Sequence, residues 1–404
     1  MPMPHHKFFA QNLLDTQPES RFVSPKFGKL YIGIPKETTL QENRVPLVPS
    51  SIAVLTGRGH RVVVESMAGI KSNYTDHEFS EAGAEIAYTR EKVFAAHVIL
   101  KIAPPNLEEI DLMHAHQIII SPLQVPTVTE EYLQRLRQKR VTALAMEYIK
   151  DEPGYFPIVR IMSEIAGQCA ILTAAELLSS DNEGVGILLG GISGVPPAKV
   201  VILGGGVVAE FATRTAMGLG AEVRIFDNNI HKLMRLQTQL GRQLYTSALN
   251  PIQLEEQLRT ADVAIGAIHS GAGRTPLIVR EETVSKMKQG SVIIDVSIDQ
   301  GGCFETSQLT SHDKPTFKRY DVIHYCVPNI PSRVPRTASN AVSNILTSIL
   351  LRCEDAGNME RLLGNHSGLM NGIYICRGSL TNKYLSQQFN MKYTHIELVI
   401  TANS

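Results

Sequence analysis

A glycine-rich turn between an apolar run and a helical segment constrains this chain more than any other feature. The segment VVILGGGVVAEFATRTAMGLGAEVRIFDNN places Gly204, Gly206 and Ala209 at the three small-residue positions of a dinucleotide turn. The first glycine permits the tight turn, the second lets backbone amides approach a pyrophosphate, and the third small residue lets helix and strand pack closely. Asp227 follows the next apolar run, 21 residues after Gly206. This context predicts a nucleotide-binding unit, against the alternative of a glycine turn used only for packing.

The acidic residue at position 227 favours NAD over NADP. A carboxylate accepts hydrogen bonds from the adenosine ribose and repels a ribose phosphate. Lys232 lies close by in the sequence, where a cation would offset that repulsion or would simply be a solvated helix residue. We therefore expect NAD as the cofactor, bound by Gly204, Gly206, Ala209, Asp227 and Lys232.

Short apolar runs alternate with segments of helical spacing on both sides of this turn. The runs are LYIGI, HRVVVES, HVILKIA, QIIISPL and VTALAMEY before it, and KVVILGGGVV, AEVRIFDN, ADVAIGAI and GSVIIDVSI from it onward. Such alternation predicts largely parallel sheets covered by helices. The predicted fold class is α/β with two doubly wound domains, in which a Rossmann NAD-binding domain is inserted into a flavodoxin- or Rossmann-like substrate domain.

Length and two long helical segments predict the domain boundaries. A chain of 404 residues exceeds what one hydrophobic core usually serves. The segments IMSEIAGQCAILTAAELLSS and ASNAVSNILTSILLRCED flank the second unit, which indicates that the chain leaves the first domain and later returns to it. We expect an N-terminal arm at residues 1–28, a substrate domain at 29–156 plus 335–404, and an NAD-binding domain at 157–334.

Charge and cysteine usage limit the partners and the location. Lys plus Arg and Asp plus Glu both total 39, so no field of one sign would attract nucleic acid or an anionic membrane. No apolar stretch reaches the roughly 18 residues of a membrane span, and the N-terminus lacks a secretory pattern, so we expect a cytoplasmic protein. The five cysteines are scattered without a Cys-x-x-Cys pair, which predicts buried thiols and no metal site.

Several further segments occur in an order that a known family shares. They are IGIPKE with ENRVPLVP, ILLGGISGVPPAKVVILGGG, and DVSIDQGGCFETSQLTSHDKPTF with YCVPNIPSRVPRTAS, spanning about residues 30–352. Together they resemble alanine dehydrogenases and the related NAD-binding part of proton-pumping transhydrogenase, with DQGGCFE and HYCVPNIP closer to the dehydrogenases. The resemblance implies NAD-dependent, reversible oxidative deamination of L-alanine to pyruvate and ammonia in a homo-oligomer, either a hexamer or a dimer.

The resemblance assigns roles to four residues. Arg44 falls where the family binds the substrate carboxylate, a task suited to the two parallel hydrogen bonds of a guanidinium; a surface ion pair is the alternative. Asp299 falls on the active-site aspartate of the family, unless it caps a turn. Asn329 matches a residue near the nicotinamide and the substrate, and Ser163 one near the cofactor phosphates, although both types are common at turns and helix caps.

Two positions depart from the family pattern. The family has a substrate-binding lysine two residues after the one that matches Lys101, and here that position is Ala103. The catalytic histidine of the family falls on Gln124, which can orient a water molecule but cannot titrate. Lys101 lies in an apolar run, where burial would lower its pKa, unless it snorkels or forms a structural ion pair. We place Gln124 and Asp299 at the catalytic position and Lys101 with Arg44 at the substrate.

Other histidines and other functions stay open. His114 and His116 precede the QIII run and are predicted to be solvated, whereas His269 follows an apolar run near the cofactor and is a candidate base. The leading hypothesis is an amino-acid dehydrogenase acting on L-alanine or on another 2-amino or 2-oxo acid. The rival is an NAD(H)-binding homologue without deamination activity, acting as a sensor, a partner subunit or a transhydrogenase-like protein. Gln124 and Ala103 favour the rival because both changes fall on substrate positions.

Overall fold

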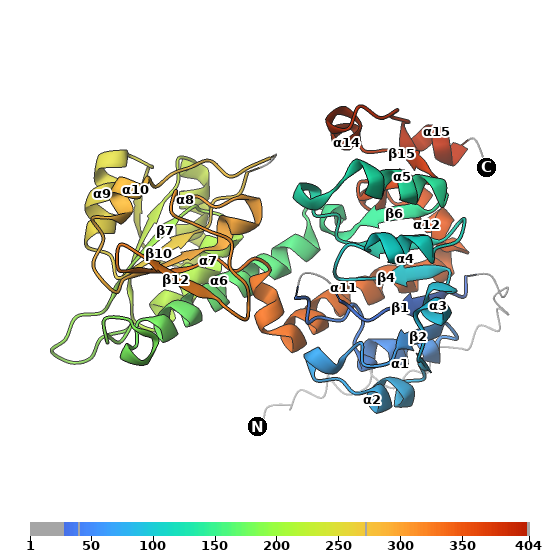
Figure 1. The fold of residues 1–404 in the computed structure, drawn as a ribbon, viewed down its shortest axis with the longest axis horizontal. Coiled ribbons are helices and arrows are strands. Elements are labelled where there is room, and N and C mark those ends of the chain that lie inside the picture. The colour runs from blue at the N-terminus through green and yellow to red at the C-terminus, as the bar shows by residue number, and fades with distance from the viewer. Residues whose placement is uncertain (1–27, 39–40, 271–272, 402–404) are drawn as a thin grey trace, which may run out of the picture.

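The computed structural model describes residues 28–38, 41–270 and 273–401, which form two sheets (Figure 1). The first sheet has the strand order β15-β14-β6-β5-β4-β1-β2-β3. Its strands are β1 (Tyr31–Ile34), β2 (Arg61–Glu65), β3 (Glu85–Ala87), β4 (Val98–Leu100), β5 (Ile118–Ser121), β6 (Thr142–Ala145), β14 (Ile373–Cys376) and β15 (Ser379–Leu380). The strands from β1 to β6 pair in parallel, whereas β14 is antiparallel to β6 and β15 to β14.

Helices cover both faces of this first sheet. They are α1 (Pro49–Gly57), α2 (Asp76–Glu81), α3 (Arg90–Phe94), α4 (Leu107–Asp111), α5 (Glu130–Gln138), α12 (Met359–Asn365), α13 (Ser367–Met370), α14 (Lys383–Gln388) and α15 (Ile396–Thr401). Side chains of β2 alternate between two cores: Val62 and Val64 pack with α1, and Val63 packs with α3 and α5. Strands buried on both faces explain why the sequence shows continuous apolar runs there instead of alternation.

The second sheet has the order β12-β13-β11-β10-β7-β8-β9. Its strands are β7 (Lys199–Leu203), β8 (Glu222–Phe226), β9 (Tyr245–Ser247), β10 (Val263–Gly266), β11 (Val292–Asp295), β12 (Thr316–Arg319) and β13 (Val322–Tyr325). Only β12 pairs antiparallel among these described strands. The helices around it are α7 (Val207–Gly218), α8 (Ile230–Leu240), α9 (Pro251–Arg259) and α10 (Glu281–Val284).

Two long helices, α6 (Pro157–Leu177) and α11 (Pro335–Ala356), run between the two sheets in Figure 1. α6 packs closely along α7 because it carries Gly167, where a Cβ would come within 2.4 Å of the Val208 carbonyl oxygen. α11 contributes Leu346 and Leu350 to the core that contains α1. Within the described chain α6 is also the one helix long and apolar enough to span a membrane, but half of that stretch is buried in the structure.

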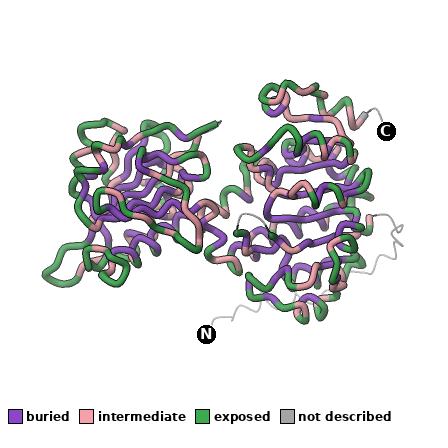
Figure 2. Tube along the Cα trace, viewed as in Figure 1, coloured by how far each residue is buried: buried purple, intermediate pink, exposed green. Residues whose placement is uncertain are grey.

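The predicted fold class is confirmed, because strands from both ends of the chain complete one sheet and the strands between them form another. The boundaries at residues 157 and 335 coincide with the first residues of α6 and α11 and stay predictions. The predicted arm at residues 1–28 lies, apart from Gly28, outside the described residues. All five cysteines are buried, as expected, and Figure 2 shows that burial is concentrated in the strands of both sheets.

Candidate functional site

Both sheets reverse their strand order in the middle, and the loops at these points carry the predicted site residues. In the first sheet β1 lies between β2 and β4, so the loop after β1, which holds Arg44, and the loop after β4, which begins at Lys101, diverge. In the second sheet β7 lies between β8 and β10 in the same way, and Gly204 begins its loop. Open α/β sheets bind ligands at such switch points, outside the carboxyl ends of their strands.

A polar network joins the two domains at this level. The Glu42 carboxylate accepts from Arg44 Nε at 2.7 Å and from Arg44 Nη2 at 2.6 Å, a two-point pairing that fixes the guanidinium. The same carboxylate accepts from Asn329 Nδ2 at 2.8 Å, and the Asn329 backbone amide donates to Asp299 Oδ1 at 3.2 Å. Three residues predicted from the sequence, Arg44, Asn329 and Asp299, therefore belong to one network, linked by Glu42.

The pKa values of the two acids in this network, Glu42 and Asp299, shift in opposite directions. Burial acts to raise the pKa of Glu42, but the charge and hydrogen bonds of Arg44 outweigh it, so the pKa is lowered. Although Asp299 is an exposed residue, desolvation of its carboxyl group by the surrounding atoms raises its pKa to about 6, and the Asn329 amide and Arg44 only partly oppose this. It is therefore the acid in the network that exchanges a proton near neutral pH.

Asp299 does not cap its turn, contrary to the alternative considered from the sequence. The 3-10 helix η5 (Val296–Gln300) is capped by Asp295, whose side chain accepts from the Ser297 amide. Asp295 also accepts from Cys303 N at 2.9 Å and from Ser307 Oγ at 2.7 Å. These bonds occupy Asp295 and leave Asp299 at the domain junction.

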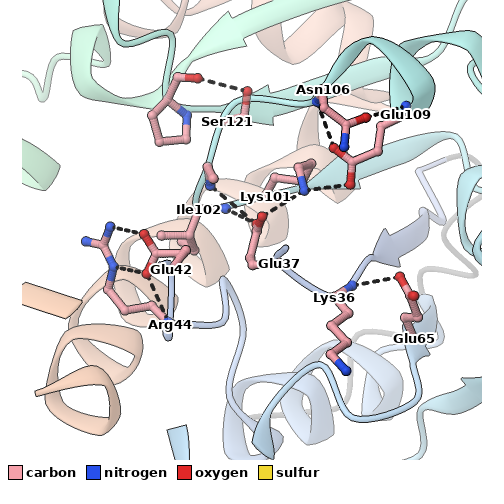
Figure 3. Close-up of polar contacts among 12 residues, drawn as sticks. Lys36, Glu37, Glu42, Arg44, Glu65, Lys101, Ile102, Asn106, Glu109 and Ser121 are labelled. Carbon is pink, nitrogen blue, oxygen red and sulfur yellow. Dashed lines mark hydrogen bonds and ion pairs between the residues drawn. The ribbon is translucent and has the colours of Figure 1, made fainter. Parts of the chain in front are cut away.

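Lys101 lies in a separate buried cluster of charges beside the Glu42–Arg44 pair (Figure 3). Its side chain is 1% exposed, and Nζ donates to Glu37 Oε2 at 2.8 Å and to Glu109 Oε1 at 3.1 Å. Burial alone would lower the pKa of Lys101, but the two carboxylates outweigh burial and raise the pKa. The possibility of a lowered lysine pKa is therefore wrong, and the structural ion pair holds.

The same cluster fixes the position where the family has its second lysine. Glu37 Oε1 accepts from the backbone amides of Ile102 at 2.6 Å and Ala103 at 3.3 Å, as Figure 3 shows for Ile102. The Ala103 side chain is fully buried. The strand end is thus held by Glu37 and Lys101, while Ala103 contributes no charge.

Gln124 follows β5 in a left-handed backbone conformation, with φ of 49°. The backbone N–H groups of Gln124 and Leu123 donate to Glu147 Oε1 at 3.1 and 2.8 Å. Glu147 lies in the 3-10 helix η3 (Met146–Tyr148), and burial raises its pKa. The buried Glu147 carboxyl group therefore holds the loop that carries Gln124 at the carboxyl edge of the sheet.

The dinucleotide turn has the geometry that its sequence predicts. Gly204 has φ of +113°, and a Cβ there would lie 2.3 Å from the Ala267 carbonyl oxygen, so this position requires glycine. A Cβ at Gly206 would meet nothing within 4 Å, which leaves open space in front of the α7 N-terminus. Ala209 is fully buried against the sheet. The open space at a helix N-terminus suits a phosphate group.

Asp227 ends the second strand of this unit and is largely buried. Its Oδ2 accepts from Gly205 N and its Oδ1 from Asn229 N, both at 2.7 Å, and Lys232 Nζ lies 3.8 Å from Oδ2. These bonds orient the carboxylate beside the turn. The residues present thus fit a dinucleotide, with Lys232 near the acid, as expected.

The remaining predicted residues are Ser163 and three histidines. Ser163 is half-buried on α6, and His114 and His116 are exposed, as predicted. His269 is exposed after β10, and partial desolvation of its ring, together with the charge of Lys232, lowers its pKa. No group of three metal-binding side chains occurs in the described parts of the chain.

Sequence reasoning missed the acidic partners Glu37, Glu42, Glu109 and Glu147. Glu42 stands two residues before Arg44 in the segment ENR, which is the one signal the sequence offered for it. Glu109 was visible as the acidic end of a capping box with Asn106, but that pattern predicts a helix start and not a lysine partner.

Two protein-family models together match most of the described chain. The model "Alanine dehydrogenase/PNT, N-terminal domain" matches residues 33–166, and "Alanine dehydrogenase/PNT, C-terminal domain" matches residues 170–383.

Individual proteins give the same result. The chain is 38% identical over 367 residues to an alanine dehydrogenase of Staphylococcus epidermidis, covering 91% of this chain and 98% of the relative. It is 37% identical over 370 residues to that of Staphylococcus saprophyticus, covering 91% and 99%. A solved L-alanine dehydrogenase superposes with a TM-score of 0.84 at 36% identity over 89% of this chain and 99% of that one. A transhydrogenase from Sinorhizobium meliloti, 24% identical with a TM-score of 0.74 over 87% and 99%, shares the fold.

Proposed function

This chain belongs to the alanine dehydrogenase/PNT family, and on that premise we propose that it is an NAD-dependent amino-acid dehydrogenase. The reaction is the reversible oxidative deamination of L-alanine to pyruvate and ammonia. The observation that carries the proposal is the network in which Arg44, Asn329 and Asp299 meet across the domain junction through Glu42. It brings a carboxylate-binding cation and a titrating acid to the side of the dinucleotide unit.

NAD(H) is the cofactor of this family, and its oxidised form, when bound, would accept a hydride from the α-carbon of the amino acid. In our assignment the amides at the α7 N-terminus, made accessible by Gly204 and Gly206, hold its pyrophosphate, and Asp227 holds the adenosine ribose. Ala209 keeps α7 close to the sheet, Lys232 flanks Asp227, and Ser163 lies toward the phosphates.

We assign the substrate to the other side of the junction. Arg44 binds the carboxylate, Asn329 lies beside the reacting carbon, and Asp299 holds the amine and a water molecule by hydrogen bonding. Lys101 supports the substrate site indirectly. Its buried side chain pairs with two carboxylates within 3.1 Å and so holds the loop after β4 in place. Gln124 orients the water that adds to the carbon, with its loop fixed by Glu147.

A second candidate function is an NAD(H)-binding homologue without deamination activity, and Ala103 and Gln124 favour it. Glutamine cannot transfer a proton, and a positioned acid–base side chain contributes on the order of a hundred- to ten-thousand-fold in rate. Both substitutions fall on the substrate side, whereas the dinucleotide turn is intact. An intermediate possibility is a dehydrogenase that turns over slowly, or one that acts on another 2-amino or 2-oxo acid.

The deciding experiment follows NADH oxidation with pyruvate and excess ammonium for the unmodified protein and for Gln124→His. We expect measurable turnover without the substitution and a gain of on the order of a hundredfold with it, because the histidine restores proton transfer. Gln138→His, at an exposed position on α5, is the matched control and should change nothing. NADH binding without turnover by the unmodified protein would overturn the dehydrogenase proposal in favour of the second candidate.

We also propose a cytoplasmic homo-oligomer, either a hexamer or a dimer, that binds neither membrane nor nucleic acid. Large apolar side chains are exposed along one segment of the second domain, among them Leu188 at 67%, Ile192 at 66% and Val195 at 56%. Apolar exposure of this extent is typical of a surface that a second copy covers. A monomeric mass in sedimentation analysis would contradict this proposal.

A further inference from the structure

The loop that carries Arg44 forms neither helix nor strand over residues 41–48. A backbone N–H that is buried without a partner is costly, so each buried donor in such a loop needs an acceptor from elsewhere. Arg44 donates its own backbone N–H to Glu42 Oε1 at 2.9 Å. The donors on either side of it reach instead to a segment that lies 289 or more residues later in the chain.

Three serines of that later segment accept these N–H groups. Asn43 N donates to Ser332 Oγ at 2.9 Å, Val45 N to Ser339 Oγ at 2.9 Å, and Val48 N to Ser343 Oγ at 3.0 Å. Ser332 lies in the 3-10 helix η6 (Ile330–Arg333), and Ser339 and Ser343 lie one turn apart on α11. All three serines are fully buried. We call these three residues the serine row.

The hydroxyl groups of the serine row donate as well as accept. Ser343 Oγ donates to Ser51 Oγ at 2.7 Å. Ser72 Oγ gives its one proton to the Asn43 carbonyl oxygen at 2.7 Å, so Ser339 is the donor in its 3.1 Å contact with Ser72. A hydroxyl suits these positions because it fills both roles at once, whereas alanine would leave a buried N–H of the loop without an acceptor.

The serine row also links the loop to the domain junction. Ser332 N donates to the Asn329 carbonyl oxygen at 2.9 Å, and Ser332 Oγ lies 3.3 Å from Glu42 Oε1. Ser332 therefore connects the backbone of Asn329 with the carboxylate that pairs with Arg44. Because the hydroxyls carry no charge, they hold the backbone without competing for the guanidinium, which Glu42 binds at two points.

We propose that the serine row consists of positioning residues for substrate binding: its hydroxyls hold the loop after β1 so that Arg44 meets the substrate carboxylate. The role in substrate binding rests on the proposed function, whereas the hold on the loop is a property of the folded protein. Ser332 and Ser339 accept from the two residues directly beside Arg44, and Ser343 accepts from Val48, where α1 begins. The effect on Arg44 should therefore be smaller for Ser343.

The first test needs no turnover. Hydrogen exchange of the full chain with NADH, followed by mass spectrometry of a peptide that spans residues 41–48, measures how firmly the loop is held. We expect Ser339→Ala to speed exchange of this peptide by on the order of tenfold, because the Val45 N–H loses its acceptor. Thr347→Val is the matched control, since the Thr347 hydroxyl donates within α11 to the Ser343 carbonyl oxygen. Exchange as slow in Ser339→Ala as in the unmodified protein would overturn the proposal.

The second test measures pyruvate binding to the NADH-bound protein by calorimetry without ammonium, and then turnover with ammonium. We expect Ser339→Ala to weaken pyruvate binding and to raise the KM for pyruvate, each by on the order of tenfold, while kcat and the KM for NADH change little. Ser343→Ala should have a smaller effect. Ser339→Thr, which keeps a hydroxyl, should recover most of the affinity, and Thr347→Val should change neither quantity.

Two outcomes separate the serine row from the proposed reaction. Equal pyruvate binding by the unmodified protein and by Ser339→Ala would overturn the positioning role, whether or not the protein turns over. Weaker pyruvate binding by Ser339→Ala, with no turnover by the unmodified protein, supports the positioning role and refutes only the reaction.

Discussion

The Asp299 carboxylate accepts a hydrogen bond from the Asn329 backbone amide at 3.2 Å, and through Asn329 it is linked to the Glu42–Arg44 pair. Its pKa is raised to about 6 from an ordinary value of 3.8, chiefly because the surrounding atoms limit its hydration. The folded protein therefore binds the proton more tightly than the unfolded chain does. Stability from this group is full below the unfolded pKa and is lost as the pH rises through about 6.

Asp299→Asn should therefore raise the melting temperature at pH 8 and leave it nearly unchanged at pH 4, while turnover falls by on the order of a hundredfold or more. The amide keeps the shape of the side chain but removes the charge that the folded state disfavours. Thermal unfolding and NADH oxidation measure the two effects. Asp181→Asn, at an exposed position away from this network, is the control, and an equal stabilisation at both pH values would contradict the assigned pKa.

Single residues show where sequence reasoning stops. Arg44, Asp299 and Asn329 were predictable because each stands in a motif that a family shares. Glu42 was not, because its role depends on a contact with Asn329, 287 positions away, that no local pattern encodes. The buried pair of Lys101 with Glu37 was missed for the same reason, since a lysine in an apolar run does not reveal its partner.

In the turn between β7 and α7, one glycine is required for folding and another is explained only by ligand binding. Gly204 is required by the backbone, because an added Cβ would collide with the Ala267 carbonyl oxygen at 2.3 Å. Gly206 has no such neighbour within 4 Å, so the protein alone gives no reason for glycine there. The reason must lie in what approaches the helix N-terminus.

Gly206→Ala should consequently weaken NADH binding by on the order of tenfold or more while leaving the melting temperature of the cofactor-free protein close to its original value. NADH fluorescence titration and thermal unfolding separate the two. Gly218→Ala, at the end of α7 with nothing within 4 Å, is the matched control and should keep full affinity. If both variants bind NADH equally well, the pyrophosphate does not lie at this turn.

At the level of elements, the long apolar strands were predictable and the edge strands were not. β9 and β12 lie at the two edges of the second sheet, and their residues are largely exposed or half-buried. An edge strand has only one neighbour and one sheltered side, so it carries no apolar run for the sequence to display. β14 and β15 were missed because only the pairing of β14 with β6, and of β15 with β14, identifies them as part of the first sheet.

Over the whole molecule, the two sheets differ in how much of the chain each one needs. The second sheet is complete once β13 ends at Tyr325, whereas the first needs β14, whose Ile373 pairs with Leu144 of β6, 229 positions earlier in the chain. A chain that ends at Asn371 should therefore keep NADH binding and a protease-resistant second domain but expose its first domain to digestion. Limited proteolysis followed by mass analysis checks this expectation. A first domain that survives equally well in the shortened chain would show that β14 is dispensable.

The late pairing of β14 with β6 also sets an order of events during synthesis. As the ribosome elongates the chain, β1 to β6 emerge first, yet the edge of β6 keeps unpaired amides and carbonyls until β14 has also left the exit tunnel. During that interval the second domain has every strand it needs and can mature alone. The nascent polypeptide thus carries a complete nucleotide-binding domain beside an incomplete first sheet with an exposed strand edge. We expect chaperones that shield such edges to assist its folding.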